Sequence, residues 1–362
     1  MFELADAWVW DTWYTRADGR HHAFHLQAPR SLGDPALRHH AASIGHATST
    51  DLQHWRSSGT AVRASSTGFD DLATWTGCVV RDDAGTWHLI TSGLSRAEGG
   101  RVQRIGGRSA ERVEGPWGEP RWVLEADPRW YAVLGAAGAD ETHWRDPWVV
   151  RGDDGRWHLH ATARAAGSTA AVIAHATSAD LLTWQVQPPL SAPSRRFGWA
   201  EVVSFHRIDG RWWLLFSCLG DQLGGPDAAI EDAGGTWIVA CDGPGRSVDL
   251  DAAVRLTTAR LYVARLVPAD PVAAPDAERC DLSLEQLRLI AFVDRDADGR
   301  FGGRLTDPLR LACAEDDAPA LVDGDPAWHP HERPARAGLP ALATGSSIHD
   351  GSSGTYLPVE EN

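Results

Sequence analysis

The stretch RDPWVVRGDDGRWHLHATA, residues 145–163, contains two apolar segments with alternating side chains, separated by a short polar turn that ends in Asp-Gly. Such a pattern predicts a β-hairpin, because glycine readily adopts the positive φ that a tight turn requires. The same unit recurs at residues 10–28, 76–93, 200–218 and 290–305. The sequence therefore predicts five hairpins.

The turn glycines of these units are Gly19, Gly85, Gly155, Gly210 and Gly299, on average about 70 residues apart. A second repeat follows two of the hairpins: IGHATSTDLQHW at 44–55 and IAHATSADLLTW at 173–184. We expect each copy to form a strand, a turn and a Trp-ended strand, which completes a four-stranded sheet.

About five such units predict an all-β fold, a five-bladed β-propeller, with two stacked sandwiches as the alternative. SLEQLRLI, residues 283–290, fits either a short helix or a strand. We assign residues 1–313 to the propeller, as a single domain. Residues 314–362 are rich in Pro, Gly, Asp and Ser, which predicts an irregular C-terminal tail.

Composition narrows the classes of partner. The formal net charge of −15 disfavours nucleic acid, and no apolar run approaches the roughly 20 residues that span a bilayer. The N-terminus lacks the pattern of a secretory signal, so we expect a soluble, cytoplasmic protein with no membrane partner. Five scattered cysteines without a CxxC pair predict neither a disulfide framework nor a zinc site, and we expect no metal and no cofactor. Eighteen tryptophans favour a small carbohydrate as ligand.

Three carboxylates stand near the start of the first strand of their hairpins. Asp11 lies eight residues before its turn glycine, and Asp146 and Glu201 lie nine residues before theirs. The first strand of each propeller blade lines the central channel, so we expect the three acids to meet at one mouth. Clustered carboxylates shift one another's pKa and supply the acid, base and nucleophile of glycosidic cleavage.

The neighbouring residues predict different roles for these acids. Arg145 stands beside Asp146, and a guanidinium lowers the pKa of an adjacent carboxyl, so Asp146 is expected to be an ionised partner. FGWAEVVSF, residues 197–205, surrounds Glu201 with apolar side chains. An apolar environment raises the pKa of a carboxyl group, which predicts Glu201 as the general acid.

Several stretches resemble the glycoside hydrolases of families 32 and 68, the β-fructosidases and levansucrases, and more remotely those of family 43. VWDTW (9–13) is similar to the nucleophile motif of levansucrase-type enzymes, WRDPWV (144–149) to their RDP motif, and Glu201 follows about 55 residues later, at the place of the acid/base. Further similar stretches are HAFHLQA (22–28), TWTGCVV (74–80), YVARLV (262–267) and GGRLTDPLRL (302–311).

This resemblance implies a five-bladed propeller and a retaining mechanism on small β-fructofuranosides such as sucrose or short fructans. Asp11 would attack the anomeric carbon, Glu201 would protonate the leaving oxygen and then activate water, and Asp146 would hold ring hydroxyls. The alternatives are an inverting arabinofuranosidase or xylosidase of the family 43 kind, a fructosyltransferase, and a sugar-binding propeller without catalysis.

Seven further residues are candidates for sugar contacts. Indole rings stack on the C–H faces of sugars, and arginine donates to their hydroxyls. For each tryptophan the alternative is a place in the core, and for Gln27 it is a solvated strand end. The candidates are Trp10, Trp13, Gln27, Trp75, His143, Trp144 and Arg145.

Overall fold

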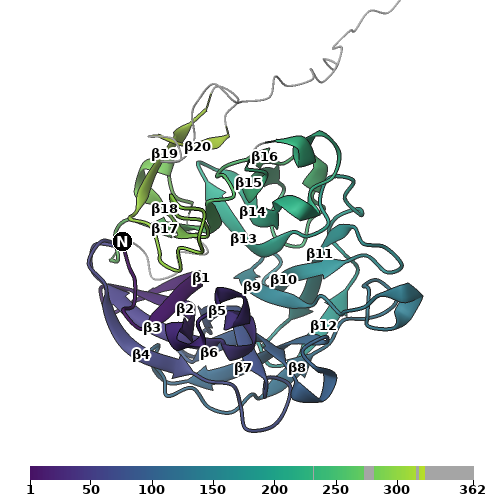
Figure 1. The fold of residues 1–362 in the computed structure, drawn as a ribbon, viewed down its shortest axis with the longest axis horizontal. Coiled ribbons are helices and arrows are strands. Elements are labelled where there is room, and N and C mark those ends of the chain that lie inside the picture. The colour runs from purple at the N-terminus through teal and green to yellow at the C-terminus, as the bar shows by residue number, and fades with distance from the viewer. Residues whose placement is uncertain (231, 273–280, 315–317, 323–362) are drawn as a thin grey trace, which may run out of the picture. The chain divides into compact units, whose positions relative to one another are not determined.

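The computed structural model describes residues 1–230, 232–272, 281–314 and 318–322. Most of the predicted tail, 314–362, therefore lies outside the described residues. Within them, twenty strands form five four-stranded antiparallel sheets, each with its strands in chain order (Figure 1). The innermost strands β1, β5, β9, β13 and β17 pack side by side, and β17 returns to β1. The predicted five-bladed β-propeller is confirmed.

The strands have the following bounds. The first blade comprises β1 (Ala7–Ala17), β2 (Arg20–Pro29), β3 (Ser43–Ser49) and β4 (Arg56–Val62). The second comprises β5 (Ala73–Arg81), β6 (Trp87–Leu94), β7 (Gln103–Ala110) and β8 (Trp122–Leu124). The third comprises β9 (Arg145–Arg151), β10 (Trp157–Arg164), β11 (Ala171–Ser178) and β12 (Trp184–Gln187). The fourth comprises β13 (Glu201–Ile208), β14 (Arg211–Leu219), β15 (Gly234–Cys241) and β16 (Val254–Arg255). The fifth comprises β17 (Leu261–Pro268), β18 (Leu287–Val293), β19 (Leu309–Cys313) and β20 (Pro319–Leu321).

Short 3-10 helices lie in the connections. They are η1 (Arg30–Leu32), η2 (Pro35–Ala41), η3 (Arg96–Glu98), η4 (Ala136–Gly138), η5 (Gly220–Gln222), η6 (Gly225–Ala229), η7 (Leu250–Ala252) and η8 (Leu284–Gln286). Residues 283–290 thus begin with one 3-10 turn and continue as strand β18. Within the described ranges, no helix is both long and apolar enough to span a bilayer.

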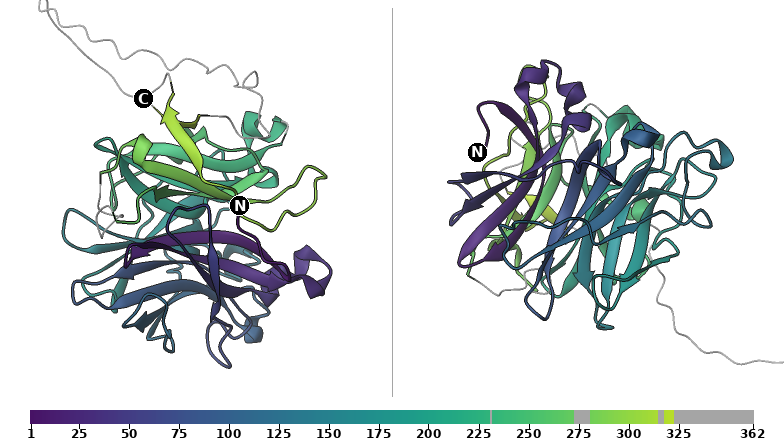
Figure 2. Two further views of the ribbon diagram at one scale, coloured as in Figure 1. Left: turned by 90° about the vertical axis from the view of Figure 1, so that its left-hand side faces the viewer. Right: turned by 90° about the horizontal axis from the view of Figure 1, so that it is seen from below.

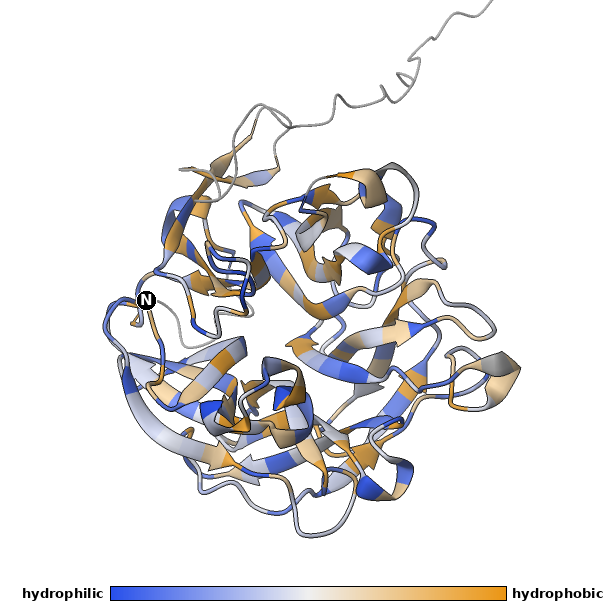
Figure 3. Cartoon of the chain, in the orientation of Figure 1, coloured by the Kyte–Doolittle hydropathy of each residue, from blue (hydrophilic) through white to orange (hydrophobic). Residues whose placement is uncertain are grey.

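Apolar side chains fill the spaces between neighbouring blades, and hydrophobic and polar residues alternate along the strands (Figure 3). The N-terminal segment lies beside the fifth blade (Figure 2). Phe2 forms a bridge with Leu305 of this blade, and the Val9 N–H donates to the Gly303 carbonyl. The first and last parts of the described chain are therefore joined by backbone contacts.

The fifth predicted hairpin, 290–305, is wrong in its place within the blade. The first two strands of this blade are β17 and β18, and the Asp-Gly turn at Gly299 lies between β18 and β19. The turn closes locally, with the Gly299 N–H donating to the Asp296 carbonyl. An Asp-Gly signal identifies a tight turn but does not specify which strands it joins. The last strand, β20, lies beyond residue 313, where the sequence placed the end of the propeller.

Each innermost strand contains a β-bulge near its start, where it has one residue more than the second strand. In the described residues, four of these bulges hold a non-glycine residue with positive φ: Asp11 (26°), Asp146 (59°), Val202 (53°) and Val263 (49°). A bulge redirects side chains, and a left-handed φ is costly for such residues unless the surroundings impose it. The bulges therefore determine where the acids at this end of the propeller point.

The bulges also correct the predicted register of the three acids. The first two strands are joined by two-residue turns in the first and fourth blades and by a longer loop in the third. Counting residues to the turn glycine consequently misplaces Glu201 by one position. Val202 is the residue with positive φ in its bulge, as Asp11 and Asp146 are in theirs. Glu201 stands one residue before Val202, just as Arg145 stands one residue before Asp146.

Hydroxyl groups join neighbouring blades at three of these bulges. In each case the backbone N–H of the left-handed residue donates to a side-chain hydroxyl on the second strand of the preceding blade. The bonds run from Asp146, Val202 and Val263 to Ser92, Thr162 and Ser217, at 2.7, 3.3 and 3.2 Å. The position of each bulge is thus tied to the packing of the adjacent blade.

Candidate active site

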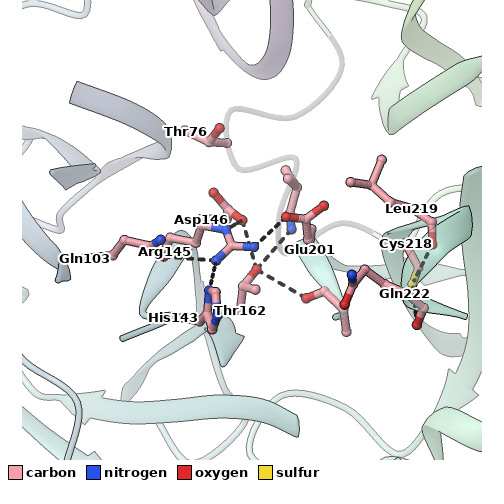
Figure 4. A network of polar contacts seen from close by, with 12 residues as sticks. Thr76, Gln103, His143, Arg145, Asp146, Thr162, Glu201, Cys218, Leu219 and Gln222 are labelled. Atoms are coloured by element: carbon pink, nitrogen blue, oxygen red, sulfur yellow. Dashed lines mark hydrogen bonds and ion pairs between the residues drawn. The ribbon is translucent and has the colours of Figure 1, made fainter. Parts of the chain in front are cut away.

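The side chains of the predicted acids belong to one electrostatically coupled group at the starts of β1, β9 and β13. The charges of Asp146 and Glu201 act on Asp11, and that of Glu201 acts on Asp146. Asp146 is 3% exposed, while Asp11 and Glu201 are partly accessible. Figure 4 shows Asp146 and Glu201 on either side of the Arg145 guanidinium. The three acids therefore lie within electrostatic range of one another.

Asp11 is held by one neighbour from the second blade. The Thr76 hydroxyl donates to Asp11 Oδ2 at 2.5 Å. Burial raises the pKa of Asp11 to about 7, with a further contribution from the Asp146 carboxylate, while the Thr76 hydrogen bond opposes the rise. Among the described residues, the hydrogen bond from Thr76 is the one that fixes the Asp11 carboxylate, and it engages Oδ2.

Asp146 differs from its prediction. Burial raises the pKa of Asp146 to about 6, even though Arg145 and a hydrogen bond from the Thr162 hydroxyl, 2.9 Å from Asp146 Oδ2, both act to lower it. The adjacent guanidinium is the one influence on Asp146 that is visible in the sequence. In the folded chain the loss of solvent is the larger effect, so the expected lowering was wrong.

Glu201 also differs from its prediction, because polar groups surround its carboxylate. Arg145 Nη2 donates to Glu201 Oε1 at 2.5 Å, and the Tyr262 hydroxyl donates to Oε2 at 2.6 Å. Arg145 is farther from its sequence neighbour, with Nε 3.4 Å from Asp146 Oδ2. The guanidinium thus pairs mainly with Glu201, and the predicted separation of roles by an apolar environment at Glu201 is wrong.

Arg145 is itself fixed by the surrounding side chains. Its Nη1 donates to Gln103 Oε1 at 2.9 Å and to His143 Nδ1 at 2.8 Å. Burial and the Arg145 charge hold the pKa of His143 far below its ordinary value, so the imidazole is neutral and Nδ1 accepts this bond. The guanidinium also lies over the Trp199 ring, 5.2 Å from its centroid. His143 and Arg145 are therefore brought to the site as expected.

Two of the four predicted tryptophan contacts belong to the core. Trp13 (1% exposed) stacks on Phe24, and Trp144 (0% exposed) packs against Tyr131, so neither presents a ring face to a sugar. Their large indoles fill the space between strands and blades, as the alternative interpretation expected.

Trp10 and Trp75 lie beside the η2 segment. The His39 ring packs edge-on against both indoles, and Trp75 Nε1 donates to the His39 carbonyl at 2.7 Å. Trp10 is buried and Trp75 half-buried. Gln27 binds within its own blade, where its amide donates to Thr60 Oγ1 at 2.9 Å.

The sequence analysis did not identify two residues that hold the carboxylates, Thr76 and Tyr262. Both residues could have been found by comparing equivalent positions between blades. Thr76 on β5 is equivalent to Asp11 on β1, and Tyr262 on β17 is equivalent to Glu201 on β13. Among the described residues, no group of three or more His, Cys, Asp or Glu side chains is placed to hold a metal ion.

Comparisons with known proteins agree with this architecture. The sequence matches the family model of the glycosyl hydrolases family 32 N-terminal domain over residues 12–233, a range that includes Asp146 and Glu201 and begins one residue after Asp11. No curated protein matches the sequence.

The fold is similar to that of several solved structures. The inulosucrase from Halalkalicoccus jeotgali bound to kestose has a TM-score of 0.65 and 19% identity, and the match covers 88% of this chain and 87% of that one. The levansucrase from Gluconacetobacter diazotrophicus has a TM-score of 0.64 and 15% identity, with 88% and 81% covered. The sucrose-6-phosphate hydrolase from Lactobacillus gasseri has a TM-score of 0.60 and 17% identity, with 86% of this chain and 60% of that chain covered. The match to the family model, which spans more than half of the chain and includes the Arg145–Asp146–Pro147 segment, shows that this chain belongs to the family 32 glycosyl hydrolases.

Proposed function

We propose that the protein hydrolyses small β-fructofuranosides, such as sucrose or short fructans, by a retaining double displacement. The observation that carries this proposal is that two carboxylates of the site are held by different partners. Asp11 is bound through one oxygen by Thr76, whereas Glu201 is held between Arg145 and Tyr262. A glycosidase needs this combination of a nucleophile and a separate proton donor. The acidic net charge and the aromatic content also fit a neutral sugar better than a nucleic acid.

In the proposed first step, the free oxygen of Asp11 attacks the anomeric carbon, and the bond from that carbon to the leaving oxygen breaks. Glu201 transfers its proton to the leaving oxygen, and a covalent fructosyl–Asp11 ester results. In the second step, Glu201 takes a proton from water as the water oxygen attacks the same carbon and releases Asp11. Arg145 and Asp146 are placed to bind ring hydroxyls.

Both oxygens of Glu201 accept hydrogen bonds, one from Nη2 of Arg145 and one from the hydroxyl of Tyr262. In the proposed reaction, sugar hydroxyls replace Arg145 or Tyr262 as partners, and the Glu201 carboxyl group is then free to face the leaving oxygen.

Fructosyl transfer is the second candidate function, because two structures with a similar fold are described as an inulosucrase and a levansucrase. A screen of released sugars separates the candidates, using sucrose, inulin- and levan-type oligosaccharides, and aryl arabinosides and xylosides. Hydrolysis of sucrose gives equal glucose and fructose, whereas transfer gives an excess of free glucose and longer products. Release of arabinose or xylose with no action on any fructoside would overturn both candidates in favour of the family 43 kind of activity.

Tyr262→Phe is expected to lower kcat/KM on the best fructoside by about 10-fold. The substitution removes one hydrogen bond to a charged carboxylate and leaves the ring in place. Tyr131→Phe is the matched control, because Tyr131 is buried and its hydroxyl donates to the Gln187 carbonyl at 2.7 Å. An equal loss of kcat/KM in both variants would show that Tyr262 acts only through stability.

The pH dependence of kcat/KM follows from the pKa of Asp11. The nucleophile must be ionised, and its pKa in the free enzyme is raised to about 7. We therefore expect kcat/KM to fall as the pH drops below about 7, about tenfold per unit well below it. Initial rates at low substrate concentration between pH 4 and 9 measure this limb. A plateau that extends down to pH 5 would contradict it.

A further inference from the structure

Arg265 is a buried cation in the interior of the propeller. It belongs to β17 and is 2% exposed. Its Nε donates to the Thr12 carbonyl at 3.0 Å, and its Nη1 donates to the carbonyls of Val202 and Val203, each at 3.1 Å. One guanidinium from the fifth blade thus binds the backbone of the first and fourth blades.

The carbonyls that Arg265 binds lie at the two bulges that hold the proposed nucleophile, Asp11, and the proposed acid/base, Glu201. Thr12 follows Asp11, and Val202 follows Glu201. Asp11 and Val202 both have positive φ, a conformation that persists in such residues only when the surroundings enforce it. The rigid fork of a guanidinium, with several donors in one plane, suits a bridge between two such segments.

Packing alone does not require a cation at this place. The equivalent positions on the other innermost strands hold Trp13, Cys78, Trp148 and Ser204. Arg265 instead lies with its Cζ 5.1 Å from the centroid of the Trp148 ring, and in the described part of the chain it forms no ion pair with a carboxylate. A buried charge carries a desolvation penalty of several kcal/mol unless it is compensated. Its presence among uncharged equivalents suggests a role for the charge.

The Arg265 guanidinium remains charged at neutral pH. Burial lowers the pKa of Arg265 to about 10, which is still well above neutrality, while the carboxylates of Asp11 and Asp146 oppose this change.

We infer that Arg265 is a positioning residue, which ties together the bulges that hold Asp11 and Glu201. This inference rests on the proposed function, in which Asp11 and Glu201 act on the sugar. It predicts that the rate of the chemical step depends on the hydrogen-bonding fork of Arg265.

Two substitutions test the role of the fork. Arg265→Lys keeps the charge but loses the fork, and we expect kcat to fall about 10- to 100-fold, with KM changed less than threefold and the pH profile unchanged. Arg265→Met removes both the fork and the charge, and we expect a larger fall in kcat, again with a smaller change in KM. Steady-state kinetics on the best fructoside from pH 4 to 9 give these quantities.

Arg108→Lys is the matched control, because Arg108 is a buried arginine that pairs with Asp70 in the second blade. We expect this variant to lose thermal stability but to keep the wild-type kcat and pH profile. A wild-type kcat in Arg265→Lys, or in a folded Arg265→Met, would overturn the inference. If Arg265→Met does not fold, the kcat of Arg265→Lys decides. Full activity of Asp11→Asn would instead overturn the proposed function and leave the bridging contacts unexplained.

Discussion

Asp11→Asn is expected to lower kcat on sucrose or a short fructan by about 10⁴-fold or more, because an amide cannot form the covalent intermediate. Asparagine is nearly isosteric and its carbonyl oxygen can still accept the Thr76 hydrogen bond, so the fold and the sugar site should be preserved. KM or ligand affinity is therefore expected to change little. Single-turnover rates measured with excess enzyme provide the lower limit for the residual activity.

The same variant is expected to be more stable than the wild type at pH 7. The pKa of folded Asp11 is raised to about 7, so the contribution of this group to stability is present below the unfolded pKa near 4 and is lost as the pH rises through about 7. Asparagine removes this loss, and we expect Tm at pH 7 to rise by at least about 2 °C, with a smaller difference at pH 5.

Asp180→Asn is the matched control for this stability effect. Asp180 accepts bonds from the backbone N–H groups of Leu182 and Thr183, which hold its pKa below the ordinary value. Its substitution is expected to lower Tm at pH 7 and to leave kcat unchanged. An Asp11→Asn variant that retains activity, or one with a lower Tm at pH 7 than the wild type, would contradict the proposed role and environment of Asp11.

The fold was predictable because its signals are local. Each Asp-Gly turn and its flanking alternation identify a hairpin without knowledge of the rest of the chain, and four of the five hairpins have the predicted place in their blades. The one-residue error at Glu201 arose because the turn signal is read within one hairpin and not between blades. Turn length and bulges decide which residues are equivalent between blades, and counting to a glycine records neither.

The site was less predictable because its contacts run between blades. Asp146 and Arg145 are adjacent in sequence, and this suggested an ion pair, yet the bulge directs the guanidinium mainly to Glu201. Thr76 and Tyr262 reach the carboxylates only through the ring of blades. The tryptophan content was also ambiguous, since Trp13 and Trp144 serve packing rather than an open site. These contacts depend on how neighbouring blades pack against one another, and no single stretch of sequence specifies that packing.

Glu201→Gln is expected to lower kcat on sucrose by about 10²- to 10⁴-fold, because glutamine neither donates the proton to the leaving oxygen nor activates water. Glutamine still accepts one hydrogen bond through its carbonyl oxygen, so either Arg145 or Tyr262 keeps a partner. Removal of the Glu201 charge also leaves Asp146, 3.4 Å from Arg145 Nε, as the remaining carboxylate partner of this guanidinium. Sugar affinity is therefore expected to survive.

The leaving group distinguishes the loss of an acid/base from general damage. An aryl β-fructofuranoside needs little protonation of its leaving oxygen, so Glu201→Gln should release a burst of phenol and then stall at the covalent intermediate, and azide should restore turnover by attack without a general base. Glu98→Gln, at a partly exposed ion pair with Arg104, is the control that should behave like the wild type. An equal loss on sucrose and on the aryl substrate, with no burst and no rescue by azide, would assign Glu201 to binding alone.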